Sequence, residues 1–479
     1  MNLSDYAACD GIELARRISA GSVTATEAID AAYALIGRLD KEINAFVALE
    51  KDLAYAALQA VPRGPLSGVP IAMKDCVAFV GGSIRNFGCG LSAGMRAEQD
   101  DEIVVRYRSA GLIPLGTTNV PELSSCLTTE SRFYGPCRNP WNLAHSVGGS
   151  SGGAAAAVAY GAVPIAYGND SAGSIRVPAS CCGVFGFRPS RGRVPTGPRE
   201  AEIWYGLLSN HVLTRSVRDS ALVLDLTEGT DAGAPYGAPA KLRPYLEECR
   251  LPAMPLRIAV SDGREQGFAI ESACASALEQ TVQRLRELGH DVVPAAPPYN
   301  GTQLLEAVTL FLSVALAEEL PGLARANGRV IGPETVESCQ RGLMERGTRA
   351  TAVQLSSALA FRSQLGRLLG RFLRDHDVLL TPTLAQPPAR LGWLDADSDD
   401  LDAYLERMWR YSPFAPLANM CGAPSMSVPL AWSRSGLPIG MMFTGRYGEE
   451  GVLFRLAAQL EKAFPWQDLH PANGAWNAP

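Results

Sequence analysis

The chain has 479 residues, of which 47% are hydrophobic and 19% are charged, and its formal net charge is −6. At roughly 150 residues per domain, this length allows about three domains or one very large one. Because the net charge is modest and no block of Lys and Arg stands out, nucleic acid or an anionic membrane is disfavoured as the main partner.

The N-terminus and the cysteines indicate a cytoplasmic protein. The opening MNLSDYAACDG has neither the basic nor the apolar segment of a secretory signal. The longest weakly polar run, 154–168, is too short to span a bilayer and is interrupted by Gly161 and Pro164. Eleven cysteines are scattered without CxxC spacing. We therefore expect reduced thiols, with neither a disulfide framework nor a zinc site.

The first third of the chain alternates helical and strand patterns. Residues 10–60 have a helical pattern, in which Thr24 and Glu27 form a capping box. The segment 64–79 is short, apolar and bounded by turns, which predicts a buried strand ending near Lys74. The elements expected next are a helix and a strand over 102–119, a helix in the alanine tract after Gly153, and a strand over 162–170.

The alternation continues to the end of the chain. The elements expected there are a strand at 256–262, a helix around 271–288, a strand at 290–295, mostly helix over 303–375, a strand at 376–384, a polar loop over 385–405, and strand, hairpin, strand and helix over 420–463. Such alternation favours one large α/β domain over 1–479. Within it we expect N-terminal helices over 1–62, a catalytic core over 63–200 and the rest of the sheet with the pocket helices over 201–479.

The stretch SVGGSSGGAAAA at 146–157 places two serines between pairs of glycines. A phosphate-binding loop would need GxxxxGK[ST], and no lysine has that spacing here. A nucleophile elbow, G-x-S-x-G, matches at Ser150 and at Ser151, but it requires a histidine base. None of the five histidines carries a supporting motif: His145, His211, His290, His376 and His470. Both interpretations are therefore disfavoured.

A serine relay with a lysine base is the third interpretation. GNDSAGSIRVPAS at 168–180 places Ser174 in a turn flanked by Gly and Ala after a strand. Small residues let successive backbone N–H groups face one point, as in an oxyanion hole, although a plain β-turn has the same composition. A buried Lys74 would be neutral and could accept a serine proton, whereas most lysines are solvated. The residues alone leave these alternatives open.

Several stretches together resemble the amidase signature family of amide hydrolases. They are GVPIAMKD, SVGGSSGGAAAAVAYGAVPIAYGNDSAGSIRVPASCCGVFGFRPSRGRV, GAPSMSVPL and GLPIGMMFTGR. The likeness covers nearly the whole chain. It implies a single large domain with a mixed, mostly parallel twisted β-sheet covered by helices on both faces. It also implies Lys74 as base, Ser150 as relay serine after a cis peptide bond from Gly149, and Ser174 as nucleophile.

The resemblance assigns supporting roles as well. The oxyanion would be held by the backbone N–H groups of Ser171, Ala172, Gly173 and Ser174. Asp170 and Arg176 would brace the loop as a charge pair, and Ser151 would hydrogen-bond locally. The chain has Asn169 where the family has Thr and Ala172 where it has Gly. This G-N-D-x-A-G-S form, together with NPWN and AAQLEKAFPW, is similar to that of the 6-aminohexanoate-cyclic-dimer hydrolases.

The resemblance implies hydrolysis of a small carboxamide or cyclic amide through an acyl-enzyme, without cofactor or metal, and a homodimer is compatible with it. Alternatives are the glutaminase subunit of a tRNA-dependent amidotransferase, a biosynthetic acyl-transfer enzyme, and a non-catalytic binding module. We expect the substrate pocket around 126–133, 204–210 and 307–316. Cys126 and Phe311 are candidate pocket residues, with packing in the helical core as the alternative for Phe311.

Overall fold

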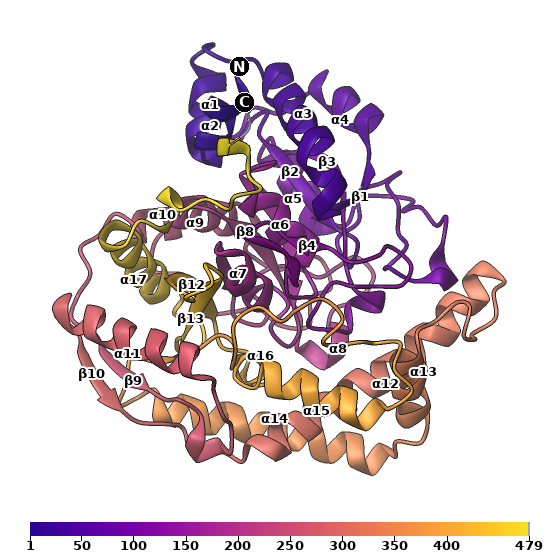
Figure 1. Cartoon of the computed structure of the whole chain (residues 1–479), viewed down its shortest axis with the longest axis vertical. Coiled ribbons are helices and arrows are strands. Elements are labelled where there is room, and N and C mark those ends of the chain that lie inside the picture. Colours follow the sequence, from indigo (N-terminus) through magenta and orange to yellow (C-terminus); the bar gives the residue numbers. More distant parts are fainter. Residues whose placement is uncertain (478–479) are drawn as a thin grey trace.

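An 11-stranded mixed sheet runs through the molecule in the computed structural model, which describes residues 1–477 (Figure 1). The spatial order of its strands is β1 (Phe46–Leu49), β3 (Ile113–Thr118), β2 (Pro70–Lys74), β6 (Ile165–Asp170), β8 (Ser209–Thr214), β7 (Phe185–Arg188), β12 (Ser425–Trp432), β13 (Pro438–Thr444), β11 (Val378–Pro382), β9 (Arg257–Val260) and β10 (Asp291–Pro294). A separate hairpin joins β4 (Arg138–Asn139) to β5 (Asn142–Ser146).

Parallel pairing occurs in two blocks of the sheet. Strands β3, β2 and β6 are parallel neighbours, and so are β11, β9 and β10. Every pair between these blocks, from β6 to β11, is antiparallel. The expected mixed α/β sheet is confirmed, and antiparallel pairs are more frequent in its middle than the resemblance implied.

Helices cover both faces of the sheet (Figure 1). They are α1 (Leu3–Ala8), α2 (Gly11–Ser19), α3 (Ala25–Ile43), α4 (Lys51–Leu58), α5 (Glu102–Ser109), α6 (Gly152–Ala159), α7 (Arg176–Cys182), α8 (Ile203–Gly206), α9 (Val217–Thr227), α10 (Tyr245–Glu248), α11 (Ser272–Glu287), α12 (Gly301–Asn327), α13 (Ser338–Thr348), α14 (Ala352–Phe372), α15 (Leu401–Tyr411), α16 (Ala415–Cys421) and α17 (Glu450–Ala463).

Strand β7 illustrates how the two faces are covered. A Cβ atom on Gly186 would lie 2.5 Å from the Cβ of Ala179, so this glycine lets β7 and α7 approach closely. The next side chain, Phe187, stacks on Phe454 of α17 with ring centroids 4.3 Å apart. Because successive side chains of a strand point to opposite faces, α7 and α17 cover opposite sides of the sheet.

Most expected elements are present, with two corrections. The capping box of Thr24 and Glu27 is confirmed at the start of α3, and β2 ends at Lys74 as expected. The helical pattern over 10–60 conceals β1, whose four residues add an edge strand next to β3. The polar loop expected over 385–405 ends earlier, because Asp400 caps α15 by accepting a hydrogen bond from Ala403 N.

Helix α12 is the one helix within residues 1–477 that is long and apolar enough to cross a bilayer by length and composition. Half of its most apolar window is buried inside the protein. Its side chains Phe311 and Leu316 are fully buried and belong to the main hydrophobic core. Because the core helix of a soluble protein has the same composition, this feature is weak evidence for a membrane span.

Candidate active site

Lys74 lies at the end of β2 and is almost fully buried, with 1% of its surface exposed. Its Nζ is 2.7 Å from Ser150 Oγ and 2.8 Å from Asn169 Oδ1, and it donates to both. Burial lowers the pKa of Lys74 to about 8, although the nearby Cys76 and Asp170 act in the opposite direction. An amine with this pKa is partly neutral near physiological pH, so it can accept a proton from a hydroxyl.

Ser150 lies just before α6, and the peptide bond from Gly149 to Ser150 is cis. A Cβ at position 149 would lie 2.7 Å from the carbonyl oxygen of Thr128 and 2.8 Å from that of Cys126. A side chain there would collide with backbone atoms that cannot move away. Glycine at position 149 is therefore required for the close packing under Ser150.

Ser174 lies in the short loop between β6 and α7. It is 6% exposed, and its carbonyl oxygen accepts a hydrogen bond of 3.1 Å from Ser151 N. This bond ties the loop of Ser174 to the segment that carries Ser150. The Ser151 hydroxyl donates to the carbonyl oxygen of Asn169 at 3.3 Å, which matches the local role expected for it.

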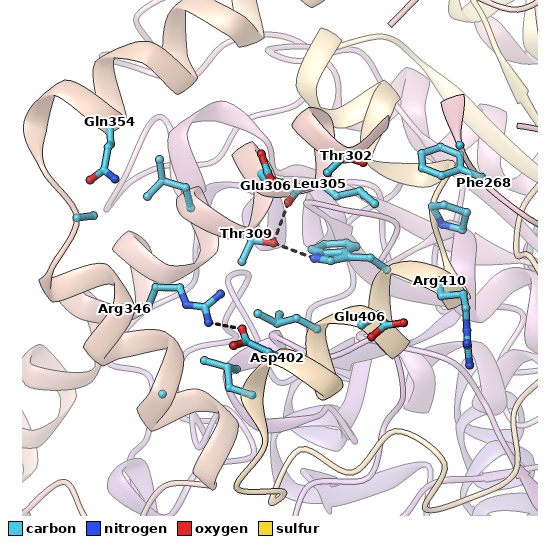
Figure 2. Close-up of a pocket in the computed structure, with 18 of the residues that line it drawn as sticks. Phe268, Thr302, Leu305, Glu306, Thr309, Arg346, Gln354, Asp402, Glu406 and Arg410 are labelled. Atoms are coloured by element: carbon cyan, nitrogen blue, oxygen red, sulfur yellow. Dashed lines mark hydrogen bonds and ion pairs between the residues drawn. The ribbon is translucent and has the colours of Figure 1, made fainter. Parts of the chain in front are cut away.

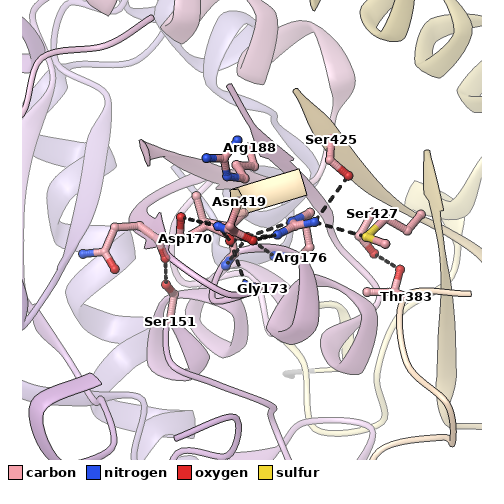
Figure 3. Close-up of polar contacts among 12 residues, drawn as sticks. Ser151, Asp170, Gly173, Arg176, Arg188, Thr383, Asn419, Ser425 and Ser427 are labelled. Atoms are coloured by element: carbon pink, nitrogen blue, oxygen red, sulfur yellow. Dashed lines mark hydrogen bonds and ion pairs between the residues drawn. The ribbon is translucent and has the colours of Figure 1, made fainter. Parts of the chain in front are cut away.

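Asp170 organises this loop from inside the protein (Figure 3). Its carboxylate accepts hydrogen bonds from the backbone N–H of Gly173, Ile175 and Arg176. It also accepts from Nε and Nη2 of the Arg176 guanidinium, both at 2.9 Å. Both side chains are fully buried. Burial alone would raise the pKa of Asp170, but Arg176 holds it well below its ordinary value.

One of the four expected oxyanion donors is committed elsewhere. The Gly173 N–H donates to Asp170 Oδ1 at 2.8 Å, so it shapes the loop and is not free for a substrate oxygen. The N–H groups of Ser171, Ala172 and Ser174 have no acceptor within residues 1–477. The expectation for Gly173 is corrected, and three candidate donors remain around the Ser174 hydroxyl.

A cavity of about 360 Å³ is lined by both serines that are candidates for catalysis, Ser150 and Ser174. Its lining combines the polar groups of Ser150, Asn169, Ser171 and Ser174 with an apolar wall. The other residues that line it are Cys76, Val77, Phe79, Arg85, Phe87, Met95, Leu123, Ser124, Thr196, Arg199, Glu200, Ile203, Trp204, Leu208, Glu319, Gly322, Leu323 and Ala326. A mostly apolar cavity with a few convergent polar groups is typical of a small-molecule site.

The two sequence-predicted pocket residues have different positions. Cys126 lines a small apolar annexe of about 30 Å³ that shares Ser124, Ser171, Ser174 and Trp204 with the main cavity. Phe311 lines neither cavity; it is fully buried and stacks on Tyr205 with centroids 5.1 Å apart. Its neighbours on α12, Val308 and Leu312, line the annexe instead. Phe311 therefore has the core position that was the stated alternative for it, whereas Val308 and Leu312 of the same helix face the annexe.

Asn169 and Asp75 have structural roles at the site that the sequence analysis did not assign to them. Asn169 orients Lys74 through Oδ1, while its Nδ2 donates to the carbonyl oxygen of Cys76 at 3.2 Å. Asp75 is fully buried and accepts hydrogen bonds from Tyr134 Oη at 2.6 Å and from Asn86 N at 3.1 Å. It thereby holds the segment that forms one wall of the cavity. The sequence signal for Asp75 is its place next to Lys74, and that for Asn169 is its departure from the Thr of the family form.

A larger hollow of about 950 Å³ lies elsewhere, between α12, α13 and α15 (Figure 2). Its lining includes the ion pair of Arg346 with Asp402 and the hydrogen bond from Trp409 Nε1 to Thr309 Oγ1. None of the serines singled out above is part of it. The smaller cavity is therefore the candidate active site, because it alone contains Lys74's partner Ser150 and Ser174.

The histidines do not support the elbow interpretation. His211 is buried against Ser220 Oγ at 2.8 Å, and His290 contacts Leu256 N and Gln459. No histidine lines the serine cavity in the part of the chain that the structure describes. Over the same residues, no three or more His, Cys, Asp and Glu side chains are grouped to hold a metal ion, and all eleven cysteines are free thiols.

Comparison with known proteins adds independent evidence. The model of the family named Amidase matches residues 27–454. The 6-aminohexanoate-cyclic-dimer hydrolase of Paenarthrobacter ureafaciens is 34% identical over 476 residues, which is 96% of each chain. A solved structure of 6-aminohexanoate cyclic dimer hydrolase with substrate superposes with a TM-score of 0.92 at 32% identity, covering 98% of this chain and 99% of the other. A bacterial aryl acylamidase of the amidase signature family superposes with a TM-score of 0.87 at 27% identity, covering 96% and 97%.

Proposed function

The chain belongs to the amidase family, and the relatives compared above are hydrolases of non-peptide C–N bonds. We therefore propose that it hydrolyses a small carboxamide or cyclic amide through Lys74, Ser150 and Ser174. The observation that carries this proposal is the 2.7 Å hydrogen bond between Lys74 Nζ and Ser150 Oγ. It joins a buried amine of lowered pKa to a hydroxyl that shares a cavity with Ser174.

The first half of the reaction acylates Ser174. Neutral Lys74 accepts the proton of Ser150, which in turn accepts that of Ser174. Ser174 Oγ attacks the amide carbonyl carbon and forms a tetrahedral oxyanion. The N–H groups of Ser171, Ala172 and Ser174 stabilise that negative charge. When the C–N bond breaks, Ser150 returns the proton to the leaving nitrogen, and the acyl group remains on Ser174.

The second half returns the enzyme to its resting state. A water molecule takes the place of the departed amine and gives a proton to the same relay. Its oxygen attacks the acyl carbon, the bond from that carbon to Ser174 Oγ breaks, and the relay returns the proton to Ser174 Oγ. The products are a carboxylic acid and an amine or ammonia. For a cyclic substrate, both groups stay on one linear product.

The test measures amine or ammonia release from a panel of aliphatic, aryl and cyclic amides and from glutamine. We expect release from at least one small amide, and mass spectrometry of a rapidly quenched reaction should find the acyl group on the peptide that contains Ser174. Release from glutamine alone, dependent on partner subunits, would instead support the amidotransferase alternative. An acyl group on Ser150 or Ser151 would refute the assigned roles.

The same interpretation extends to location and assembly. Eleven free thiols fit a reducing compartment, which supports a cytoplasmic enzyme. A homodimer remains compatible with the fold and is tested by light scattering on the purified protein.

A further inference from the structure

Arg85 has no acceptor for its guanidinium within residues 1–477. It lines the cavity that contains Ser150 and Ser174, and its Nε is buried without a hydrogen-bond partner. Its neighbours are the faces of two rings: the guanidinium carbon is 5.1 Å from the centroid of Phe79 and 5.3 Å from that of Phe87. Buried donors are usually satisfied in folded proteins. Of the three arginines with an orphaned buried nitrogen among residues 1–477, Arg85, Arg188 and Arg215, only Arg85 lines the cavity that contains the serines, where a ligand could supply the acceptor.

A second arginine of the same wall provides the contrast. Arg199 Nη2 donates to the carbonyl oxygen of Val77 at 2.6 Å and to Asp101 Oδ2 at 2.7 Å. Arg199 is therefore occupied by the protein itself, and Arg85 is not. Asp101 is a buried carboxylate near both guanidiniums, and Glu98 acts on Arg85 as a further negative charge, yet neither forms an ion pair or hydrogen bond with Arg85.

The acidic residue Glu319, which also lines the cavity, is not paired with Arg85. Glu319 of α12 accepts a hydrogen bond of 2.8 Å from Trp204 Nε1 and forms no ion pair with Arg85. Burial, together with repulsion from Glu200 and Glu318, raises the pKa of Glu319 to about 7. Much of this carboxyl is therefore protonated at neutral pH. Neither Glu319 nor Glu200, the two acidic residues that line the cavity, forms an ion pair with Arg85 within residues 1–477.

We propose that Arg85 binds a carboxylate of the substrate, so that the enzyme acts on amides that also carry a carboxylate group. This inference rests on the proposed amidase function and adds the substrate class. A planar guanidinium matches a carboxylate through two parallel N–H···O bonds, and the rings of Phe79 and Phe87 hold its plane. The cavity that contains Arg85 and the two serines also has apolar lining residues, among them Val77, Leu123 and Leu323. An aliphatic spacer would connect the two polar groups of the substrate.

The test uses a protein that binds but does not cleave. On Ser174→Ala, calorimetry measures the affinity for N-butanoyl ω-amino acids with two to six methylenes, and for the primary carboxamides of the same length. A carboxamide has the same shape without the charge. We expect at least one carboxylate to bind about 10- to 100-fold more tightly than its carboxamide, the effect of a charge-assisted pair.

The variants locate that preference. When Arg85→Gln is added to Ser174→Ala, the ratio of carboxylate affinity to carboxamide affinity should fall to near one. Arg85→Lys should retain part of this ratio. Arg96→Gln is the matched control, because Arg96 is more than half exposed, pairs with Glu50 and lies outside the cavity. It should leave the ratio unchanged. Thermal unfolding of each variant verifies that it is folded. If Arg85→Gln does not fold, Arg85→Lys still tests the inference, because it keeps the charge and removes the planar guanidinium.

Three results would overturn the inference: equal affinities for carboxylates and carboxamides, a preference that survives in Arg85→Gln, or no binding by any member of the series. The proposed function fails separately. The proposed amidase function would be refuted if the unmodified enzyme released no amine from any amide, neutral amides included. That result could occur together with an Arg85-dependent preference for carboxylates in Ser174→Ala, so the two failures are distinguishable.

Discussion

Asn169 Oδ1 lies 2.8 Å from Lys74 Nζ, on the strand next to the one that ends at Lys74. The amide oxygen and Ser150 Oγ together fix the direction of the amine, and the oxygen favours its charged form. Asn169 is also one of the two positions, with Ala172, at which the signature of this chain differs from the family form described above.

Replacing Asn169 by Ala should therefore have two effects. The plateau rate should fall by about tenfold, because the amine loses its orientation. The midpoint of the pH–rate profile should move to lower pH, because an acceptor of the charged form is removed. A full pH–rate profile of Asn169→Ala against the unmodified enzyme separates the two effects. A midpoint that moves upward would contradict the assigned role of Asn169.

The pH dependence of the unmodified enzyme follows from Lys74. The base acts in its neutral form, and burial lowers its pKa to about 8. The value of kcat/KM should therefore rise with pH, by about tenfold between pH 7 and pH 9, and then level off. Initial rates on one amide at constant ionic strength measure this. A rate that falls across that interval would mean that the charged amine is the active form.

Substitutions of Lys74 test the same base directly. Lys74→Ala should lower the amide hydrolysis rate by about 10²- to 10⁴-fold, the usual contribution of a positioned base. Lys74→Arg should be no better, because a guanidinium keeps its proton near neutral pH. Both variants are compared on an amide and on a reactive ester. Near-native amide hydrolysis by Lys74→Arg would show that this position supplies only positive charge.

Ser174→Ala should abolish turnover and leave the fold intact, since it removes one hydroxyl at the cavity surface. Ser151→Ala is the matched control. Its hydroxyl donates only to a backbone carbonyl, so its loss should reduce the rate far less. Amine release and circular dichroism on both variants measure the difference. Equal losses in the two variants would refute the assignment of Ser174 as the nucleophile.

Asp170 and Arg176 should govern stability. Asp170→Asn leaves the buried guanidinium without its counter-charge, so the free energy of unfolding should fall by about 3–5 kcal/mol. Because the pKa of Asp170 is lowered in the folded state, its contribution is present above the unfolded pKa of about 3.9 and is lost as the pH falls through the folded value. Urea unfolding at several pH values tests this. A variant as stable as the unmodified protein at pH 7 would contradict it.

Several features could be derived from the sequence because they depend on neighbouring residues. The capping box of Thr24 and Glu27 forms within a single helical turn, and a strand that ends at Lys74 follows from an apolar run bounded by turns. The glycines around Ser150 likewise indicate a backbone that is closely approached. The serine at position 174 was assigned through resemblance, since its turn alone is compatible with an ordinary loop.

Other features were decided by the tertiary structure alone. Asn419 donates to Asp170 from 249 positions away, and no local pattern indicates that contact. Rotation of α12 places Val308 and Leu312 at the annexe and Phe311 in the core, although all three are apolar residues of one helix. The Gly173 N–H and Arg85 likewise acquire their roles from which groups pack around them. Local patterns determine which elements form, whereas long-range packing determines which polar groups find partners and which remain free for a ligand.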